Sequence, residues 1–343
     1  MGTLLDKPIT EKETHTDAAN GYRYGVSAMQ GWRVEMEDAH IAKGSIEGLE
    51  DHGFFAVFDG HGGKEAALLS ARDMMQKVRA MPEYREYCSA PSSDPALLGR
   101  AMTNAFLSID VDLREQLWES DKLERPDHSG CTAIAAIVTP THIVVANCGD
   151  SRSALAVASE DIAVPMSEDH KPNNPEEMER IHNAGGTVSM KRVDGDLAVS
   201  RALGDFQYKD RPDLKPEQQK VSPEPECRVH VRNSASDQAL IIACDGIWDV
   251  MSNEQCCTYV AELIKTTGEM DAGLICEELL DECLRKGSRD NMSAIVVAFP
   301  KAFEAVGTGG VAALRQRREA EEAKRAAEEQ ADEGAYDARP EAS

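Results

Sequence analysis

The segment Phe54-Phe55-Ala56-Val57-Phe58-Asp59-Gly60-His61-Gly62-Gly63 changes abruptly from apolar to polar. Its five apolar residues have high β-propensity and predict a strand that is covered on both faces. Beyond the end of that strand, glycines let a ligand approach the main chain closely. The Asp59 carboxylate suits a hard cation held by oxygen ligands, and the His61 imidazole can exchange protons near neutral pH. By itself, the segment is equally consistent with a strand followed by an exposed glycine-rich turn.

Other carboxylates also stand at the edges of strand-like runs, namely Glu37, Asp38, Asp150, Asp245 and Asp290. Strand ends from two packed sheets can meet at one edge of a sandwich, which would gather these acids. So many acids cannot share a small space unless cations or protons neutralise them. Carboxylate, carbonyl and water ligands select Mg²⁺ or Mn²⁺, and the His and Cys spacing of a zinc site is missing.

This pattern of acids predicts hydrolysis of a phosphate ester. Two such ions can hold a shared water as hydroxide and stabilise charge during in-line attack at phosphorus. Arg33 can bind phosphoryl oxygens, although an Arg beside carboxylates is more often a surface ion pair. His61 can protonate the departing alkoxide. A covalent intermediate is not expected, because no G-x-S-x-G elbow occurs and the one Cys-x5-Arg spacing, Cys283 to Arg289, begins inside the helix predicted over 271–286.

Composition limits the classes of function. The chain has 343 residues, of which 41% are hydrophobic, enough for a full core. Its net charge of −24 argues against binding to nucleic acid, because phosphate backbones would be repelled. Nine cysteines without a C-x-x-C pair, and no secretory leader, predict reduced thiols in a cytoplasmic or nuclear protein. No stretch is long and apolar enough to span a bilayer.

Three regions are predicted along the chain. Residues 1–20 are polar and lack periodicity, which predicts a flexible arm. Residues 21–300 form the catalytic domain, with a polar segment at about 167–190 that is a candidate flap. Residues 301–343 are rich in Ala, Glu and Arg without a sustained apolar stripe, which predicts a charged, largely disordered tail with a solvated helix over 315–330. A monomer is the simplest expectation.

Local patterns predict several elements within the catalytic domain. Runs at 131–139, 142–148 and 152–158 predict a meander of antiparallel strands. Apolar residues at helical spacing predict a helix over 64–80. Ser252, with Gln three residues later, predicts a capping box that opens another helix.

Taken together, these segments resemble the metal-dependent protein serine/threonine phosphatases of type 2C, in particular the animal alpha/beta subgroup. The similarity extends from about residue 22 to residue 299. Seven motifs occur in the family's order, which makes the resemblance much more specific than any one of them. They cover residues 33–40, 59–63, 129–133, 149–152, 194–205, 245–249 and 290–291.

The resemblance implies an α+β fold, an α-β-β-α sandwich of two antiparallel sheets flanked by helices. It also implies a binuclear Mn²⁺ or Mg²⁺ centre in a channel at one end of the sandwich. By analogy, Asp59 would bridge the two ions. Glu37 and the Gly60 carbonyl would bind one ion, and Asp245 and Asp290 the other.

The remaining site residues are assigned by the same analogy. Asp38 would orient metal-bound water. Asp150 and Asp249 match acids that the family associates, alongside Asp245, with a weaker third metal position. Arg33 and His61 take the phosphate-binding and general-acid roles, and phosphorylated proteins are the expected substrates.

The chain departs from the family pattern at two places. Cys131 stands where the family usually has Ser, and a short charged tail follows Pro300 where the subgroup has a helical extension. The start of the chain resembles that of the subgroup and favours myristoylation of Gly2, although the motif prefers Ser or Thr where this chain has Asp6. One acyl chain would give only weak, transient membrane contact.

Two other functions stay open on sequence alone. A catalytically silent binding module would have kept the fold and lost the metals, but every acid, Arg33 and His61 are present. A hydrolase of a small phosphorylated metabolite could use the same metal site. The flap and the rim of the channel would decide between substrates, and their shapes do not follow from the sequence.

Overall fold

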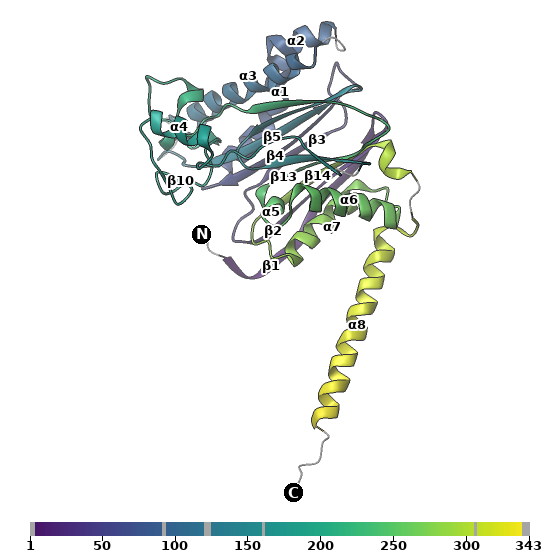
Figure 1. Ribbon diagram of the computed structural model, residues 1–343. Coiled ribbons are helices and arrows are strands. Elements are labelled where there is room, and N and C mark those ends of the chain that lie inside the picture. The colour runs from purple at the N-terminus through teal and green to yellow at the C-terminus, as the bar shows by residue number, and fades with distance from the viewer. Residues whose placement is uncertain (1–3, 91–93, 120–124, 160–161, 305–306, 338–343) are drawn as a thin grey trace.

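Two antiparallel sheets pack face to face, and helices cover both outer faces (Figure 1). The computed structural model describes residues 4–90, 94–119, 125–159, 162–304 and 307–337. The first sheet has the strand order β1 (Leu4–Ala19), β2 (Tyr22–Arg33), β14 (Met292–Ala298), β13 (Asp237–Ala243), β7 (Arg152–Val157) and β8 (Ala163–Pro165). The second sheet has the order β12 (Glu226–Val231), β6 (His142–Cys148), β5 (Gly130–Val138), β4 (Gly53–His61) and β3 (Ala39–Lys43), with β11 (Leu203–Gly204) paired to β5.

Each sheet has its own helical layer. The second sheet carries α1 (Glu65–Ala80), α2 (Pro82–Ser89) and α3 (Ala96–Leu113), followed by the π-helical turn η1 (Arg114–Trp118). The first sheet carries α5 (Asp245–Trp248), α6 (Asn253–Thr267) and α7 (Ala272–Arg285). The predicted capping box is present, because Ser252 and Gln255 exchange side-chain to main-chain hydrogen bonds at the start of α6. This architecture confirms the predicted α-β-β-α sandwich.

The central strand β4 shows why the sequence folds in layers. Side chains alternate across a strand, so neighbouring residues face opposite sides. Phe55 and Val57 pack between the two sheets, whereas Phe54, Ala56 and Phe58 pack against the helices of the outer layer. All five are fully buried. The uninterrupted apolar run therefore builds two cores at once and ends at Asp59.

The predicted meander over residues 131–158 is wrong in one respect. β5 and β6 are antiparallel neighbours, but β7 belongs to the other sheet and pairs with β13. Gly149, between β6 and β7, has φ +123, and a Cβ there would lie 2.5 Å from Cβ of Thr132. A glycine lets the chain turn sharply and cross between the sheets at this point. The crossing places Asp150 where the two sheets meet.

The predicted flexible arm over residues 1–20 is wrong for the part that the structure describes. β1 pairs with β2 along most of its length and forms the edge of the first sheet. Most side chains of β1 are exposed, so the pairing depends on main-chain hydrogen bonds and leaves no strong apolar pattern in the sequence. Gly2 lies outside the described residues.

The tail is more ordered than predicted. After the short turn η4 (Pro300–Phe303), α8 (Gly310–Asp337) forms a long helix that extends away from the sandwich (Figure 1). Arg315 and Arg318 of α8 form ion pairs with Glu278 of α7 at 2.7 and 2.5 Å, and the Glu278 side chain is 1% exposed. These contacts dock the start of α8. None of the described helices is both long and apolar enough to cross a membrane.

The predicted flap is a small subdomain beside the second sheet. It contains α4 (Pro175–Asn183) and the hairpin of β9 (Val188–Ser189) and β10 (Arg192–Val193), and the chain returns through the short turns η2 (Phe206–Tyr208) and η3 (Pro216–Gln218). Its own apolar cluster consists of Ile181, Val193, Val199, Ala202, Tyr208 and Val221.

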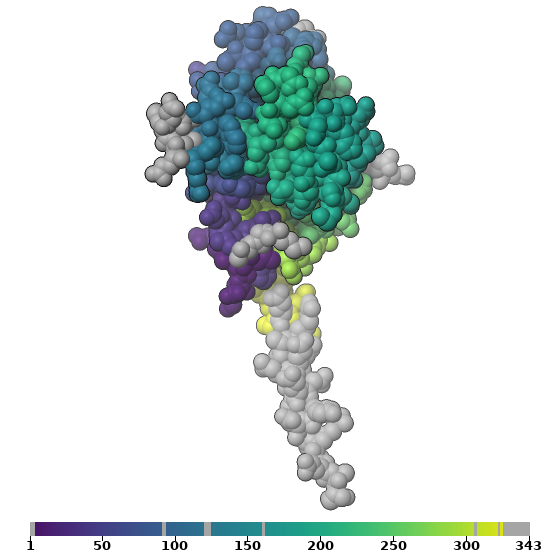
Figure 2. Space-filling model, turned by 90° about the vertical axis from the view of Figure 1, so that its left-hand side faces the viewer, coloured from purple at the N-terminus to yellow at the C-terminus, as the bar shows by residue number. Residues whose placement is uncertain are grey.

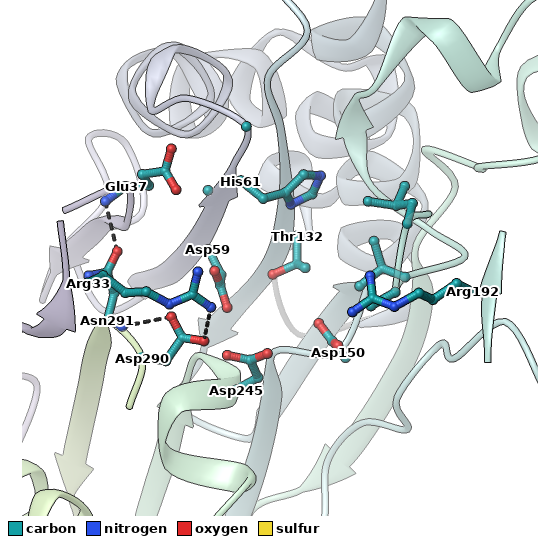
Figure 3. A pocket seen from close by; sticks show the side chains of 15 residues that line it. Arg33, Glu37, Asp59, His61, Thr132, Asp150, Arg192, Asp245, Asp290 and Asn291 are labelled. Carbon is teal, nitrogen blue, oxygen red and sulfur yellow. Dashed lines mark hydrogen bonds and ion pairs between the residues drawn. The ribbon is translucent and has the colours of Figure 1, made fainter. Parts of the chain in front are cut away.

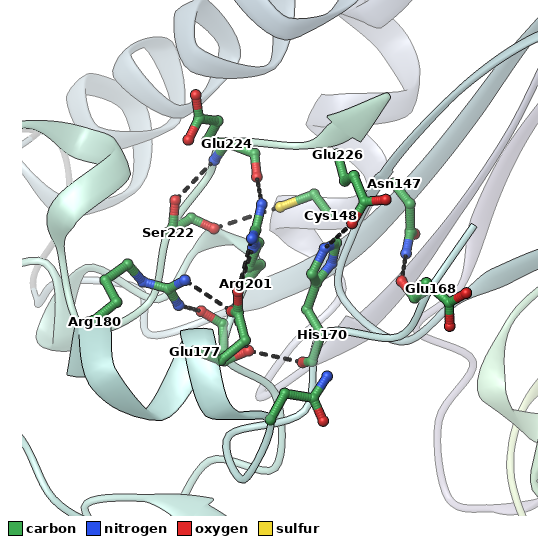
Figure 4. A network of polar contacts seen from close by, with 12 residues as sticks. Asn147, Cys148, Glu168, His170, Glu177, Arg180, Arg201, Ser222, Glu224 and Glu226 are labelled. Atoms are coloured by element: carbon green, nitrogen blue, oxygen red, sulfur yellow. Dashed lines mark hydrogen bonds and ion pairs between the residues drawn. The ribbon is translucent and has the colours of Figure 1, made fainter. Parts of the chain in front are cut away.

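A buried ion-pair network anchors this subdomain (Figure 4). The Glu177 side chain is 4% exposed and accepts hydrogen bonds from Arg180 at 2.8 Å, Arg201 at 2.7 and 3.0 Å, and Ser200 Oγ at 2.6 Å. Burial alone would raise the pKa of Glu177, but the hydrogen bonds and the charges of the two arginines lower it to about 2.

We expect Glu177→Gln to destabilise the protein in a pH-dependent way. The pKa is depressed in the folded state, so the carboxylate stabilises the fold above its unfolded pKa of 4.5, and this stabilisation is lost as pH falls toward 2. The shift corresponds to about 3 kcal/mol at neutral pH. Chemical unfolding at several pH values should show the largest deficit at pH 7 and a shrinking one in acid. The neighbouring exposed Glu176→Gln is the matched control.

Candidate metal centre

The predicted acids gather at one end of the sandwich, where strand ends from both sheets meet. Figure 2 faces this end, and Figure 3 shows that Asp59, Asp245 and Asp290 point toward one another. A pocket of about 280 Å³ opens here. Eight predicted site residues line it, namely Arg33, Glu37, Asp59, Gly60, His61, Asp150, Asp245 and Asp290. The other two lie beside the pocket. A carboxylate oxygen of Asp38 lies within 4.8 Å of one of Asp59. Asp249 lines an adjoining pocket, and Arg33 and Asp290 line both pockets.

The fold explains how acids far apart in sequence converge. Asp59 is near the end of β4 in the second sheet, whereas Asp245 follows β13 and Asp290 precedes β14 in the first sheet. Asp150 lies at the crossing from β6 to β7 and is 4% exposed. Glu37 follows β2, and its Oε1 accepts a hydrogen bond from the Gly63 main chain at 2.7 Å.

Electrostatics of the site favour cations. Burial raises the pKa of Asp59 well above its usual range, and the charges of Asp245, Asp38 and Asp150 raise it further. Burial raises the pKa of Asp245 well above its usual range too, and the charges of Asp150 and Asp290 raise it further. These acids repel one another in a small space, and bound cations would relieve that repulsion.

Two further observations fit a metal centre. Oδ1 of Asp38 is buried and has no hydrogen-bond partner among the described residues, while its Oδ2 accepts from Ser293 Oγ at 2.7 Å. A buried polar oxygen without a partner is costly unless something else binds it. A Cβ at Gly60 would lie 2.3 Å from the Glu37 carbonyl oxygen, so only glycine allows this close approach of two backbones.

Cys244 lies close to Asp38 and Asp59, with ligand atoms within 4.8 Å of one another. Burial raises the pKa of the Cys244 thiol well above its usual value, and the nearby carboxylates raise it further. In the metal-free site this disfavours the thiolate, which is the form of cysteine that binds metals. The donor set is thus oxygen, as Mn²⁺ and Mg²⁺ prefer.

Arg33 sits over the acids and is 38% exposed on its side chain. Its Nη2 donates to Asp290 Oδ2 at 2.6 Å. Asn291, to which the sequence assigned no role, holds the surrounding chain: its Oδ1 accepts from Glu37 N–H at 3.0 Å, and its Nδ2 donates to main-chain carbonyls of Gln30 and Glu35. A guanidinium has five N–H donors, so Arg33 can pair with Asp290 and still present donors to a phosphoryl group.

His61 has a partner that the sequence did not reveal. Its Nε2 lies 2.7 Å from Oδ2 of Asp205, whose side chain is only 2% exposed. Burial alone would lower the pKa of His61, but the charge and hydrogen bond of Asp205 raise it above its usual value. Asp205 has φ +53, which a non-glycine residue rarely adopts. The main chain at Asp205 therefore adopts an unfavourable conformation that places the carboxylate beside the His61 imidazole.

We expect Gly130→Ala to disturb this pair. A Cβ at Gly130 would lie 2.2 Å from Asp205 Oδ2 and 2.6 Å from His61 Nε2, so one of the two side chains must move. Overpacking of this kind costs about 1–3 kcal/mol, and kcat should fall because His61 is displaced. Thermal unfolding and steady-state kinetics measure both effects. Gly99→Ala is the control, since its Cβ would meet Cys227 Cβ at an ordinary 3.6 Å.

Two more pocket residues and one neighbour of the pocket escaped the sequence analysis. Arg192 reaches the pocket from β10 of the flap, and Thr132 reaches it from β5. Lys171, in the segment before α4, contacts Asp150 of the pocket. Thr132 Oγ1 shares a hydrogen bond with Ser151 Oγ at 2.7 Å and so braces the turn that carries Asp150. No short motif joins these residues to the acids, because the fold brings them together over long separations.

Comparison with known proteins identifies the class. The chain belongs to the protein phosphatase 2C family, whose model matches residues 22–292, and it is a protein serine/threonine phosphatase of this metal-dependent class. This confirms the resemblance found in the sequence.

Within the family, the chain is similar to animal phosphatases of the predicted subgroup. It is 46% identical to mouse protein phosphatase 1A over 303 residues, covering 88% of this chain and 77% of the relative. It is 44% identical to rat protein phosphatase 1B over 308 residues, covering 88% of this chain and 76% of the relative. The solved serine-threonine phosphatase 2C of Toxoplasma gondii has the same fold, with a TM-score of 0.71 at 24% identity over 87% of this chain and 100% of the other.

Proposed function

We propose that this chain hydrolyses phosphoserine and phosphothreonine esters on proteins with a two-metal site at the end of the sandwich. The single observation that carries the proposal is the convergence of buried carboxylates from both sheets beside Arg33 and His61. Two Mn²⁺ or Mg²⁺ ions, when bound, would activate water and neutralise charge on the phosphate. The residues that would hold them are Glu37, Asp59, Asp245, Asp290 and the carbonyl of Gly60.

Arg33 binds the phosphate in this proposal. Its guanidinium stands at the pocket wall and is held by Asp290 at 2.6 Å. Paired hydrogen bonds from a guanidinium to two phosphoryl oxygens fix the orientation of the ester and offset its negative charge. The substrate phosphorus is thereby placed over the acids.

His61 protonates the leaving alkoxide. The Asp205 carboxylate favours the imidazolium form, which is the form that can donate a proton. Asp205 does not touch the substrate in this scheme and acts as a positioning residue. Serine and threonine alkoxides are poor leaving groups, so they need this proton at the moment the P–O bond breaks.

Asp38 orients the attacking water in this proposal. Its Oδ2 accepts a hydrogen bond from the Ser293 hydroxyl at 2.7 Å, which fixes the direction of the carboxylate. Its unpartnered Oδ1 is the oxygen available to the water.

The substrate class is tested by comparing two kinds of phosphate ester. We expect hydrolysis of a phosphothreonine peptide with Mn²⁺ to exceed hydrolysis of small phosphorylated metabolites in kcat/KM. A preference for a small metabolite would overturn the proposed substrate class while leaving the metal site intact. Binding of Mn²⁺ without hydrolysis of either ester would favour a catalytically silent module.

A further inference from the structure

Lys171 places a fixed positive charge at one corner of the acidic site. Its ammonium donates to Oδ2 of Asp150 in a close ion pair. The Asp150 side chain is 4% exposed, and that of Lys171 is 35% exposed. The Lys171 charge also lowers the pKa of Asp245 and of Asp249. We call the part of the site formed by Asp150, Asp245 and Asp249 its corner.

The two residues that precede Lys171, Asp169 and His170, are anchored, which fixes the main chain that carries Lys171. Asp169 accepts two hydrogen bonds from Arg152, each at 2.8 Å, and the Arg152 guanidinium packs over Trp248. The Asp169 and Arg152 side chains are 18% and 22% exposed. A two-bond pair of this kind is geometrically specific.

His170 forms two hydrogen bonds with Gly149, in the turn that contains Asp150. Its N–H donates to the Gly149 carbonyl at 2.9 Å, and its Nδ1 accepts from the Gly149 N–H at 3.2 Å. The His170 carbonyl accepts in turn from the Ser200 main-chain N–H at 3.2 Å. The Ser200 hydroxyl lies within hydrogen-bond distance of both this carbonyl and Glu177 and shares its one proton between them. The segment with Lys171 and the turn with Asp150 are therefore held as one unit, and the ammonium is placed on the carboxylate at little further entropic cost.

We infer that Lys171 is a tethered cation that competes with a divalent ion for the corner formed by Asp150, Asp245 and Asp249. The inference rests on the proposed two-metal function. It adds that Lys171 lowers the affinity of the weakest cation position for a divalent ion. An ammonium on Asp150 cancels the charge of that carboxylate, so a divalent ion must displace Lys171 or bind beside it. No described contact joins Lys171 to Glu37, Asp59 or Asp290, and its ion pair is with Asp150. The effect should therefore be largest at the weakest position and smaller at the tight position that shares Asp245.

The prediction concerns the binding of Mn²⁺ and does not depend on turnover. Lys171→Met removes the charge and keeps most of the side-chain volume. The weakest Mn²⁺ binding step should tighten by about ten-fold, since one nearby unit charge is removed, while the tighter steps change less than about two-fold. Titration calorimetry measures the tight steps, and electron paramagnetic resonance of free Mn²⁺ measures the weak one.

Matched variants distinguish the loss of the Lys171 charge from a structural disturbance caused by the substitution. Lys171→Arg keeps the charge and should bind Mn²⁺ as wild type does, whereas the second neutral variant Lys171→Gln should repeat the shift seen with methionine. Lys77, on α1, is 27% exposed and so comparable to Lys171, and it pairs with Asp112 of α3. Lys77→Met removes this ion pair and should leave every step unchanged. In an Asp150→Asn background, Lys171→Met should change the weakest step less than it does in wild type, because Lys171 and Asp150 act as a coupled pair.

The outcomes also separate this inference from the proposed function. Two tight Mn²⁺ steps with an unchanged or weaker third step in Lys171→Met would overturn the role of Lys171 and leave the two-metal function standing. An equal shift in Lys171→Arg or Lys77→Met would likewise overturn it. No Mn²⁺ binding by the wild-type protein would overturn both.

Discussion

Asp59→Asn should reduce kcat/KM for a phosphothreonine peptide by about 10³-fold or more while leaving the fold intact. Asp59 lies near the end of the central strand, and the charges of Asp245, Asp38, Asp150 and Asp290 all raise the pKa of its carboxyl group. An amide keeps the shape but loses the charge that holds hard cations, and electrostatic stabilisation of this kind is usually the largest catalytic contribution.

The same substitution should make the metal-free protein more stable. Burial and repulsion between carboxylates disfavour the charge of Asp59 in the folded state, and the amide removes that charge. Thermal unfolding in chelator should therefore give a higher Tm for Asp59→Asn than for wild type, whereas added Mn²⁺ should stabilise wild type more. Asp112→Asn, in a partly exposed ion pair, is the control. Turnover retained by Asp59→Asn would contradict the metal assignment.

Asp205→Asn should lower kcat for a phosphoserine peptide by about 10²-fold, within the range of general acid catalysis. The amide can keep a hydrogen bond to His61 but loses the charge that favours the imidazolium form. An activated aryl phosphate has a good leaving group that needs no proton, so its hydrolysis should fall much less. Steady-state kinetics on the two substrates give the comparison.

His61→Gln is the companion variant to Asp205→Asn. It should show the same dependence on the leaving group, with little change in the affinity for Mn²⁺ and a smaller additional loss when combined with Asp205→Asn. Equal losses on the peptide and the aryl phosphate would argue against proton donation by His61. A large loss of Mn²⁺ affinity would instead assign His61 to the metal site.

Much of this molecule follows from short-range patterns in the sequence. The apolar run before Asp59 predicts a strand buried on both faces, and alternate residues of that strand do enter two different cores. The positions of the acids at strand ends predict that they lie close together, because strand ends from two packed sheets meet at one edge of a sandwich. The structure brings eight of the ten predicted residues to one pocket wall and sets Asp38 and Asp249 beside it.

Other features depend on contacts that no local pattern encodes. Asp205 is 144 residues from His61, and their pairing requires the small Gly130 between them. The first strand is polar because it is an exposed edge, so the pattern of a flexible arm and that of an edge strand look alike. The tail helix lacks a long apolar stripe, since only its start docks, through the buried Val311, the partly buried Leu314 and two arginines on the buried Glu278.

The most direct test of metal binding by the carboxylates combines two measurements on one preparation. Mn²⁺ is titrated calorimetrically, and hydrolysis of a phosphothreonine peptide is followed with Mn²⁺, with Mg²⁺ and with chelator. We expect two tight Mn²⁺ sites per chain, and turnover that disappears in chelator and returns when metal is restored. Turnover that persists in chelator, or a protein that binds no Mn²⁺, would contradict the proposed metal centre.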